Sequence, residues 1–337
     1  MGMSMMILED YSATPAAARG AVLALGNFDG VHRGHQVVLQ AAIDAAKKKG
    51  GDTPAGAVVF EPHPRRFFQP DLPFFDLTPL HVKLKLLEAF GLDLTVALPF
   101  DAALAALTAA EFVEQVLVKG LQVSHVVTGY DFAFGKGRAG NTAFLRECGK
   151  KHGFDVTIIE PVSENGSAVI SSSGVRGALR IGRPRYAARL LGHWWSVTGT
   201  VRHGDGRGKG LGYPTANLRL HRNCDPKMGI YAVRVFIGDE RIHGVAYFGT
   251  RPTFGGIEPV LEPYLFDFEG DLYGQEIEVE FIEYIRGDAR FSNPDDLKRQ
   301  IKDDCQRARK MLAAIEADDP MLAYPLGRRR ERLVQHG

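Results

Sequence analysis

The feature that most constrains the fold is a glycine-rich turn between an apolar run and an alanine-rich run near the N-terminus. The apolar run at 21–25 predicts a buried strand, and the alanine-rich run at 36–49 predicts a helix. Glycines at 26, 30 and 34 allow left-handed backbone and the close approach of a ligand. The free N–H groups at the start of the helix favour an anion. This turn therefore predicts an α/β sheet with a phosphate site.

Two histidines, His32 and His35, lie in the turn three residues apart and are expected to point from one side of it. Such a pair is also compatible with metal ligands or ordinary surface histidines, although no third ligand is obvious nearby. The whole string at 26–35, Gly-Asn-Phe-Asp-Gly-Val-His-Arg-Gly-His, is far more specific than the pair. It resembles the His-x-Gly-His signature of the nucleotidyltransferase superfamily, whose members attack the α-phosphate of a nucleoside triphosphate and release pyrophosphate. The resemblance implies that both histidines hold phosphates in the transition state.

Short apolar runs alternate with helical patterns through the rest of the first half. Such alternation predicts a parallel sheet with right-handed crossovers, whose ligands bind beyond the carboxyl ends of the strands. The further strands are expected at 57–60, 94–98, 124–128 and 154–159, and the helices at 79–90, 109–119 and 141–152. Residues 1–20 show no clear period.

Two loops after these strands are rich in aromatic residues. The loop at 60–68 has prolines that fix its course, and its aromatics and arginines suit a planar, anionic ligand. On composition alone, a rigid turn with surface arginines explains them slightly better. The loop at 129–140 contains Gly-x-Gly-x-x-Gly at its end. A dinucleotide fingerprint belongs directly after the first strand, so we interpret this spacing as coincidence and the preceding aromatics with Asp131 as a ligand loop.

A serine run at 171–173 precedes a helical segment that extends to Ile181. Serines before a helix are first of all N-caps. Arg176 lies one turn into this segment, where a guanidinium can reach a triphosphate bound at the helix start.

The pattern changes near residue 190. Strands expected at 196–202, 230–237, 241–248, 260–268 and 275–284 predict a small antiparallel barrel or sandwich. Asn293 followed by Pro294 predicts the start of a long terminal helix, and the basic tail at 328–332 is expected to be a frayed, solvated end. We therefore expect an α/β domain at 1–190 and a mainly antiparallel β-barrel with a terminal helix at 191–337.

The second half has one glycine-rich stretch, at 204–212, in which Lys209 suits phosphates. It is not a Walker A loop, because Gly210 stands where a serine or threonine should follow the lysine, and a flexible hairpin loop explains the glycines as well. The Pro-Thr-Ala-Asn that follows supplies Thr215 and Asn217, whose hydroxyl and amide oxygens are hard ligands suited to Mg²⁺.

The motifs of residues 20–190 together resemble, in order, the FMN adenylyltransferase module of bifunctional riboflavin kinase/FAD synthetases. The resemblance implies a Rossmann-like nucleotidyltransferase that transfers the adenylyl group of ATP to FMN, with His32, His35 and Arg176 as catalytic residues. It further implies ATP contacts at Gly26, Phe28, Asp29, Gly34 and Ser172, and flavin contacts at Pro62, His63, Pro64, Phe68, Asp131 and Phe134.

The second half resembles the riboflavin kinase module, whose most specific mark is Pro-Thr-Ala-Asn. That resemblance implies that Thr215 and Asn217 bind Mg²⁺ with ATP, that Lys209 contacts ATP, and that Glu262 is the general base for the riboflavin 5′-hydroxyl. Without the resemblance, Glu262 would be taken for a solvent-facing acid. Tyr247 and Tyr264 depart from many relatives and affect the expected flavin site.

Composition fits a cytoplasmic enzyme with two domains. The chain has 337 residues, more than one typical core, and a net charge of +1 that gives no electrostatic case for nucleic acid or membrane binding. The 3 cysteines are widely spaced, which fits a reducing compartment, and neither a signal peptide nor a membrane-spanning segment is expected. Self-association is not readable from the sequence.

We therefore expect a two-step flavin cofactor enzyme that makes FMN and then FAD, with ATP, riboflavin and FMN as its small-molecule substrates. One alternative is a nucleotidyltransferase for another small phosphate with a C-terminal binding module. The other is a non-catalytic flavin-binding or sensory protein, which would retain flavin without ATP turnover.

Overall fold

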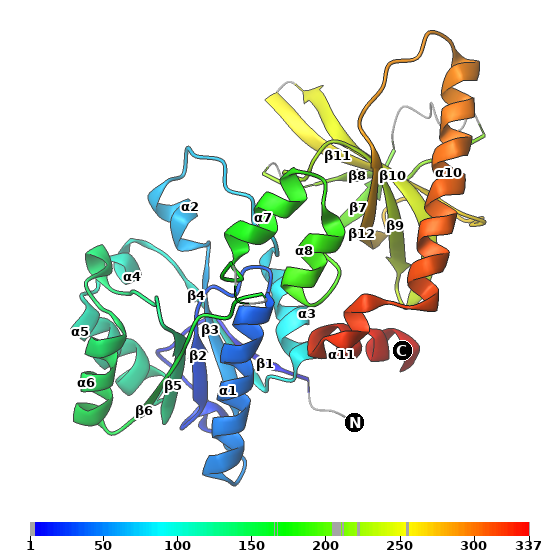
Figure 1. The fold of residues 1–337 in the computed structure, drawn as a ribbon. Coiled ribbons are helices and arrows are strands. Elements are labelled where there is room, and N and C mark those ends of the chain that lie inside the picture. The colour runs from blue at the N-terminus through cyan, green and yellow to red at the C-terminus, as the bar shows by residue number, and fades with distance from the viewer. Residues whose placement is uncertain are drawn as a thin grey trace. The chain divides into compact units, whose positions relative to one another are not determined.

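The computed structural model describes residues 4–164, 166, 168–203, 210, 212–220, 223–253 and 256–336. The chain divides into two compact units, Met1–Phe74 with Pro79–Ile170 and Phe75–Thr78 with Ser171–Gly337 (Figure 1). The second unit thus includes residues 171–190 and a four-residue segment from the first half, all of which lie inside the first domain expected from the sequence. Each unit is described by itself.

The first unit contains a six-stranded parallel sheet in its described residues, with strand order β1-β4-β3-β2-β5-β6 (Figure 1). The parallel sheet predicted from the sequence is therefore confirmed. Strand β2 lies between β3 and β5, so the strands that follow it in the chain are added first on one side of β2 and then on the other. Ligands of parallel sheets bind at such a topological switch point. The strands are β1 (Met6–Leu8), β2 (Val22–Leu25), β3 (Ala55–Glu61), β4 (Leu94–Pro99), β5 (His125–Gly129) and β6 (Asp155–Ile159).

The four helices predicted in the first unit are present, with local differences, whereas the short helices α2 and α4 were not predicted. Helix α1 begins at Arg33 rather than 36, because the side chain of His32 caps it. The helix expected at 109–119 starts with a Thr108–Glu111 capping box and then winds as a π-helix. The described helices are α1 (Arg33–Lys49), α2 (Pro64–Phe68), α3 (Leu80–Phe90), α4 (Ala102–Ala106), α5 (Ala109–Glu111), η2 (Phe112–Gly120) and α6 (Thr142–His152), with short 3₁₀ turns η1 (Ala16–Ala18) and η3 (Lys136–Arg138).

The second unit is built on a closed barrel, with strand order β10-β11-β8-β7-β12-β9 in the described part of the chain. The neighbouring strands pair antiparallel in this part of the chain, which confirms the predicted barrel. The strands are β7 (Ser196–Arg202), β8 (Asn217–Arg219), β9 (Gly229–Ile237), β10 (Glu240–Thr253), β11 (Gly256–Leu265) and β12 (Glu276–Arg286).

Helix α10 (Pro294–Ala317) packs on the outside of this barrel. Asn293 caps it as predicted, since its side chain accepts a hydrogen bond from the Asp296 N–H at 2.9 Å. Its buried Ala308 and Leu312 share a core cluster with the strand residues Ala232 and Val245. The other described helices of this unit are α7 (Ser172–Arg180), α8 (Pro184–Leu191), η4 (Pro320–Ala323) and α11 (Pro325–His336).

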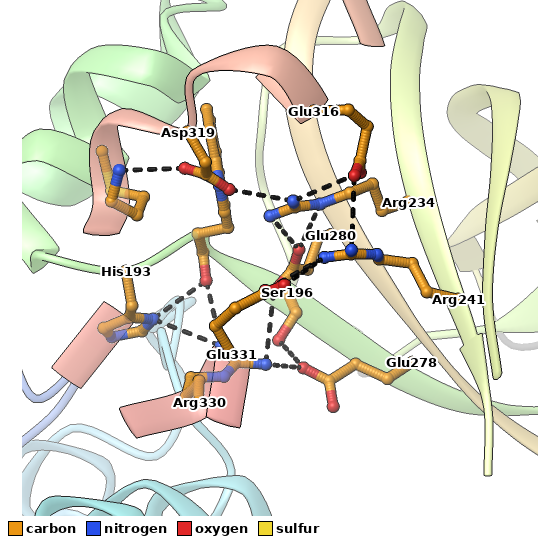
Figure 2. A network of polar contacts seen from close by, with 12 residues as sticks. His193, Ser196, Arg234, Arg241, Glu278, Glu280, Glu316, Asp319, Arg330 and Glu331 are labelled. Carbon is orange, nitrogen blue, oxygen red and sulfur yellow. Dashed lines mark hydrogen bonds and ion pairs between the residues drawn. The ribbon is translucent and has the colours of Figure 1, made fainter. Parts of the chain in front are cut away.

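The basic tail is not a frayed end, so that prediction was wrong. Residues 325–336 form α11, and Arg330 donates to Glu278 Oε1 at 2.5 Å (Figure 2). Glu331 accepts from Arg241 at 3.0 Å, and Arg241 also lies 3.3 Å from Glu316 (Figure 2). Two charged residues of the tail, Arg330 and Glu331, therefore pair with strands of the barrel.

Beside these pairs lies Arg234, whose side chain is only 4% exposed. It donates to Glu280 and to Asp319, each at 2.9 Å, and Asp319 also accepts from the indole N–H of Trp194 at 3.0 Å (Figure 2). Burial raises the pKa of the Glu280 carboxyl above its ordinary value, and the nearby Arg234 offsets part of that effect. This network joins β9 and β12 to the segment between α10 and α11.

Candidate active sites

The glycine-rich turn lies directly after β2, at the carboxyl edge of the parallel sheet. His32 Nδ1 accepts a hydrogen bond from the His35 N–H at 3.2 Å, which satisfies one N–H at the start of α1. Because Nδ1 is the acceptor, the neutral His32 ring carries its proton on Nε2. The two imidazoles stack with their ring centres 3.5 Å apart, so they leave the turn on one side, as predicted.

The backbone of the turn is strained at two residues that are not glycine. Phe28 and Val31 have φ angles of 47° and 42°, and left-handed conformations of this kind cost on the order of 1–3 kcal/mol each. The ring of Phe28 is buried and meets His35 edge-on at 5.3 Å. The surrounding structure therefore stabilises an unfavourable backbone conformation at the turn that carries Phe28 and His35.

The glycines of the turn serve different purposes. Gly30 has a φ of 82°, a left-handed conformation that favours glycine over residues with a side chain. Gly26 and Gly34 are required for space instead: a Cβ on Gly26 would lie 3.1 Å from the Phe28 ring, and one on Gly34 would lie 3.2 Å from the His32 ring.

The imidazole of His35 is in an unusual electrostatic environment. Burial, with a smaller contribution from the charges of His32 and Lys83, lowers its pKa well below the ordinary 6.5. It is therefore neutral at physiological pH and acts as a hydrogen-bonding group. Its Nδ1 and the Oδ1 of Asn27 are buried atoms with no hydrogen-bond partner in the described part of the chain. Such atoms are available to a ligand.

Lys83 is a buried cation that the sequence did not reveal, and its charge contributes to the low pKa of His35. It lies on α3 and is only 3% exposed. A sign of its burial was present in the sequence, because Lys83 is spaced i, i+3, i+4 and i+7 with Leu86, Leu87 and Phe90, so it occupies the apolar stripe of its helix.

The loop after β3 presents aromatic surface. His63 caps α2 by accepting from the Arg65 N–H at 3.1 Å, and Pro64 occupies the first turn of the helix. Phe68 is 63% exposed, and its ring packs edge-on against Phe67 at 5.2 Å. A rigid turn thus holds an exposed aromatic ring, which suits a planar ligand.

The loop after β5 is divided between exposed and buried residues. Asp131 is exposed, whereas Phe134 is 7% exposed and packs in the core against Phe112 and Phe132 at 5.4 and 5.5 Å. Phe134 therefore supports the loop from below, and the partly exposed ring at this place is that of Phe132. The glycines at 135–140 lie in a tight turn in which Phe134 and Gly140 pair.

Ser172 and Arg176 lie on α7 of the second unit. The helix is capped by Ser171, whose hydroxyl accepts from the Gly174 N–H at 3.2 Å, so the N-cap interpretation of the serine run is confirmed. Arg176 is 9% exposed, and its Nε donates to the backbone oxygen of Phe75 at 2.5 Å. The guanidinium is thereby anchored to the short segment 75–78.

Glu262 lies on β11, opposite Tyr247 of β10. The other neighbour of β11 is β8, where Leu261 pairs with Leu218, and the next step along this register brings Asn217 opposite Glu262. The Ala216 N–H donates to the Pro263 oxygen at 2.9 Å, which shows that the strands stay together there. Directly opposite side chains share a face of the sheet.

This row of three side chains lies on the outer face of the barrel. The adjacent row, Leu218, Leu261 and Phe248, is at most 1% exposed and fills the interior, whereas Glu262, Asn217 and Tyr247 are half-buried. The structure thus brings the predicted base Glu262 and the predicted ligand Asn217 together on neighbouring strands.

A cavity of about 140 Å³ lies at the adjoining segment 214–216, and none of the three side chains of this row is among its lining residues. Thr215 lies in its wall, and the exposed ring of Tyr273 stacks on His203 with centres 3.8 Å apart. The lining residues are Val201, Pro214, Thr215, Ala216, Leu265, Phe268, Gly270, Asp271, Leu272 and Tyr273. The predicted phosphate ligand Lys209 lies outside the described residues.

The oxygens of Thr215 and Asn217 fit a hard cation. The Asn217 Nδ2 donates to the Thr215 backbone oxygen at 3.4 Å, which leaves the amide Oδ1 for another partner. Hydroxyl and amide oxygens suit Mg²⁺, which commonly takes few protein ligands and completes its shell with phosphates and water. No group of three or more His, Cys, Asp or Glu side chains suited to a metal is found in the described residues.

Within the described residues, no helix combines the length and apolarity needed to cross a bilayer.

Comparison with known families finds a match for each half of the chain. The model of the FAD synthetase family matches residues 14–173, and that of the riboflavin kinase family matches residues 191–312. The parallel sheet and the barrel therefore define a transferase of flavin cofactor synthesis with two activities. The chain belongs to the bifunctional riboflavin kinase/FMN adenylyltransferase family. It phosphorylates riboflavin to FMN and adenylylates FMN to FAD, as predicted.

Two curated relatives and one solved structure illustrate the match. The bifunctional riboflavin kinase/FMN adenylyltransferase of Escherichia coli K12 is 42% identical over 303 residues, which are 90% of this chain and 96% of the relative. That of Haemophilus influenzae is 39% identical, over 86% and 94% of the two chains. A crystal structure from Streptococcus pneumoniae, described as a macrolide-efflux protein, has a TM-score of 0.79 at 31% identity and covers 90% of this chain and 97% of that one.

Proposed function

We propose that each of the two reactions is carried out by one of the residue sets described above. The observation that carries the kinase assignment is the strand register that sets Glu262 opposite Asn217, which follows the cavity-lining residues Thr215 and Ala216 in the chain. A carboxylate that removes a proton must lie within hydrogen-bond reach of it and close to the phosphates of the donor nucleotide.

In the kinase reaction, Glu262 accepts the proton of the riboflavin 5′-hydroxyl as that oxygen forms a bond to the γ-phosphorus of ATP. The bond from the γ-phosphorus to the bridging oxygen breaks, and ADP leaves. Thr215 and Asn217 would hold Mg²⁺ with ATP, and the bound ion would neutralise phosphate charge. The same proposal assigns Lys209 to the ATP phosphates.

In the adenylyl transfer, an oxygen of the FMN phosphate forms a bond to the α-phosphorus of ATP, and pyrophosphate leaves. His32 and His35 hold the phosphates through ring hydrogen bonds, and Ser172 and Arg176 act on the same ATP. The backbone around Gly26, Phe28, Asp29 and Gly34 accommodates the nucleotide. Catalysis then rests on alignment and electrostatic stabilisation, because no covalent intermediate is needed.

We further propose that FMN lies against the aromatic loops. Phe68 supports this assignment best, because its ring is exposed on a rigid turn. Asp131 is exposed beside the second loop, whereas the buried Phe134 acts by holding that loop in place. The remaining assigned contacts are Pro62, His63 and Pro64.

The functional division of the chain at 1–190 and 191–337 and a cytoplasmic location are part of the same proposal. Residues 171–190, which include Arg176, belong to the same compact unit as the barrel. The net charge of +1 supports the proposed absence of nucleic acid and membrane partners.

The test supplies riboflavin and Mg-ATP and separates FMN from FAD by chromatography. His35→Ala should stop at FMN, because adenylyl transfer loses a phosphate ligand. Glu262→Ala should block FMN formation and still convert added FMN to FAD. Glu276→Gln, an exposed acid at the start of β12, is the matched control and should behave as the wild type. If both active-site variants formed both products at normal rates, the assignments would be wrong.

A further inference from the structure

Residues 75–78 come from the first half of the chain but belong to the second compact unit, where two backbone oxygens of the segment accept hydrogen bonds from side chains. The Phe75 oxygen accepts from the Nε of Arg176 at 2.5 Å. The Leu77 oxygen accepts from the indole N–H of Trp195 at 3.0 Å. One short piece of backbone therefore connects an arginine of α7 with a tryptophan next to the barrel.

Trp195 is held firmly in the barrel. It directly precedes β7 and is only 1% exposed. Its ring packs against Phe281 of β12 with centres 4.9 Å apart, and its backbone oxygen accepts from the Phe281 N–H at 3.0 Å. The Phe75 ring meets the indole edge-on at 5.6 Å. The barrel core thus holds residues 75–78 through a hydrogen bond and through a ring contact.

The contact with Phe75 orients the guanidinium of Arg176. The side chain of Arg176 is buried, and its Nε donates to the Phe75 oxygen, so that carbonyl sets the plane of the group. Helix α7 is fixed to the same unit at its C-terminal end, where the Lys227 N–H donates to the Leu179 oxygen at 3.0 Å. A guanidinium whose plane is fixed directs its terminal N–H groups one way, as two-point binding of a phosphate requires.

We propose that Trp195 is a positioning residue for adenylyl transfer: its indole holds residues 75–78, whose Phe75 oxygen orients the guanidinium of Arg176 for the ATP phosphates. The inference rests on the proposed action of Arg176 on ATP. Every residue in this series of contacts lies in the second compact unit. A displacement of about 1 Å in a binding group can lower a rate about a hundredfold, so the support of the guanidinium affects the reaction.

The test is a double-mutant cycle in the full-length protein. Trp195→Phe removes the indole N–H and keeps an aromatic ring, and it is made alone and together with Arg176→Ala. Adenylyl transfer is measured against ATP and FMN concentration, and the riboflavin kinase rate of each sample reports whether the barrel is intact. Trp194→Phe is the matched control, because this adjacent tryptophan is also buried and its indole donates to Asp319 instead.

We expect Arg176→Ala to lower kcat/KM for adenylyl transfer about tenfold or more, the size of one lost hydrogen bond to a charged group. Trp195→Phe should lower it about threefold to tenfold, the size of one lost hydrogen bond between neutral groups. It should change the same constant, the ATP KM or kcat, that Arg176→Ala changes. In the Arg176→Ala background Trp195→Phe should have no further effect, because the group that it positions is absent. Trp194→Phe should leave adenylyl transfer unchanged, and all kinase rates should stay at the wild-type value.

Unchanged adenylyl transfer in Trp195→Phe would overturn the proposal. So would a further loss of the same size in the Arg176→Ala background, or an equal loss in Trp194→Phe, since both patterns belong to a general loosening of the barrel. If Trp195→Phe does not fold, Phe75→Leu, which removes the ring contact and keeps the backbone oxygen, takes its place in the cycle. Normal adenylyl transfer in Arg176→Ala contradicts the proposed role of Arg176 itself, whereas its loss beside an unaffected Trp195→Phe contradicts only the role of Trp195.

Discussion

His35 shows how an environment rather than a residue type decides the chemistry of a side chain. The sequence predicted two imidazoles on one side of a phosphate turn, and the stacked rings confirm that arrangement. It did not predict the neutral state of His35, which depends on burial and on a lysine nearly fifty residues away in the chain. Nor did it predict why Gly34 is glycine, because the ring of His32 fills the space only in the folded turn.

The low pKa of His35 predicts a pH dependence of stability. The unfolded chain binds a proton at this residue near pH 6.5, and the folded chain does so only well below it. Between these two values the unfolded state holds more protons, so the free energy of unfolding falls as the pH falls below 6.5. Replacement by His35→Gln removes this contribution.

The measurement is urea denaturation of the wild type and His35→Gln at about pH 7.5 and at about pH 5.5, one unit either side of the ordinary histidine value. The wild type should lose more stability than the variant between the two values. His152→Gln, on α6, is the control and should keep the wild-type dependence. An identical loss in wild type and His35→Gln would contradict the prediction.

At the scale of elements, the sequence predicted those that carry a clear period over several turns or pleats. It missed β1 and β8, because each has three residues and no period can be seen over so short a length. It also missed α8 and mistook α11 for a solvated end. Arg330 of α11 pairs with Glu278 of β12, and Glu331 of α11 pairs with Arg241 of β10. These partners are distant in the chain, so local composition could not predict the pairs.

The buried network beneath α11 predicts a large effect for one substitution. Arg234→Met leaves Glu280 buried without its closest cation, and breaking a buried pair from one side costs about 3–5 kcal/mol. Both tryptophans, Trp194 and Trp195, lie in the second unit, so their fluorescence during denaturation reports its stability.

The matched control is Arg299→Met. The Arg299 side chain is 80% exposed and pairs with Asp296 on the surface of α10, so its loss should change the free energy of unfolding by less than about 1 kcal/mol. The double variant Arg234→Met with Glu280→Gln should recover part of the stability, because the uncompensated charge is gone. A cost for Arg234→Met no larger than that of the control would refute the role given to the network.

At the scale of the whole molecule, the order of the two architectures was predictable and their boundary was not. Alternating strands and helices followed by short alternating strands indicated a parallel sheet and then a barrel, and both are present. The boundary differs because packing decides it. The segment 75–78 belongs to the second unit, where the Trp195 indole donates to the Leu77 oxygen at 3.0 Å and meets the Phe75 ring at 5.6 Å.

This segment predicts that a chain truncated to 171–337 is less stable than the same unit in the full protein. Without residues 75–78, the indole of Trp195 loses a hydrogen bond and a ring partner, and the Nε of Arg176 loses the Phe75 oxygen. A lost hydrogen bond of this kind costs about 1 kcal/mol, and packing adds to it. We expect an earlier denaturation midpoint and red-shifted tryptophan emission.

Phe75→Ala in the full-length chain should reproduce part of both changes, whereas Phe68→Ala, in the exposed loop of the first unit, should leave them unaltered. Equal midpoints for the truncated and full-length chains would show that residues 75–78 add nothing to this unit.

The position of residues 75–78 also limits how such a gene can evolve. The polypeptide passes from one unit to the other at three places, after residues 74, 78 and 170. If the gene were split at any single point, the two products could not contain one complete unit each. A lineage that separates the two activities into independent genes must replace the contacts that residues 75–78 make with Trp195. Otherwise it must duplicate the whole reading frame, after which each copy can lose the activity of one unit.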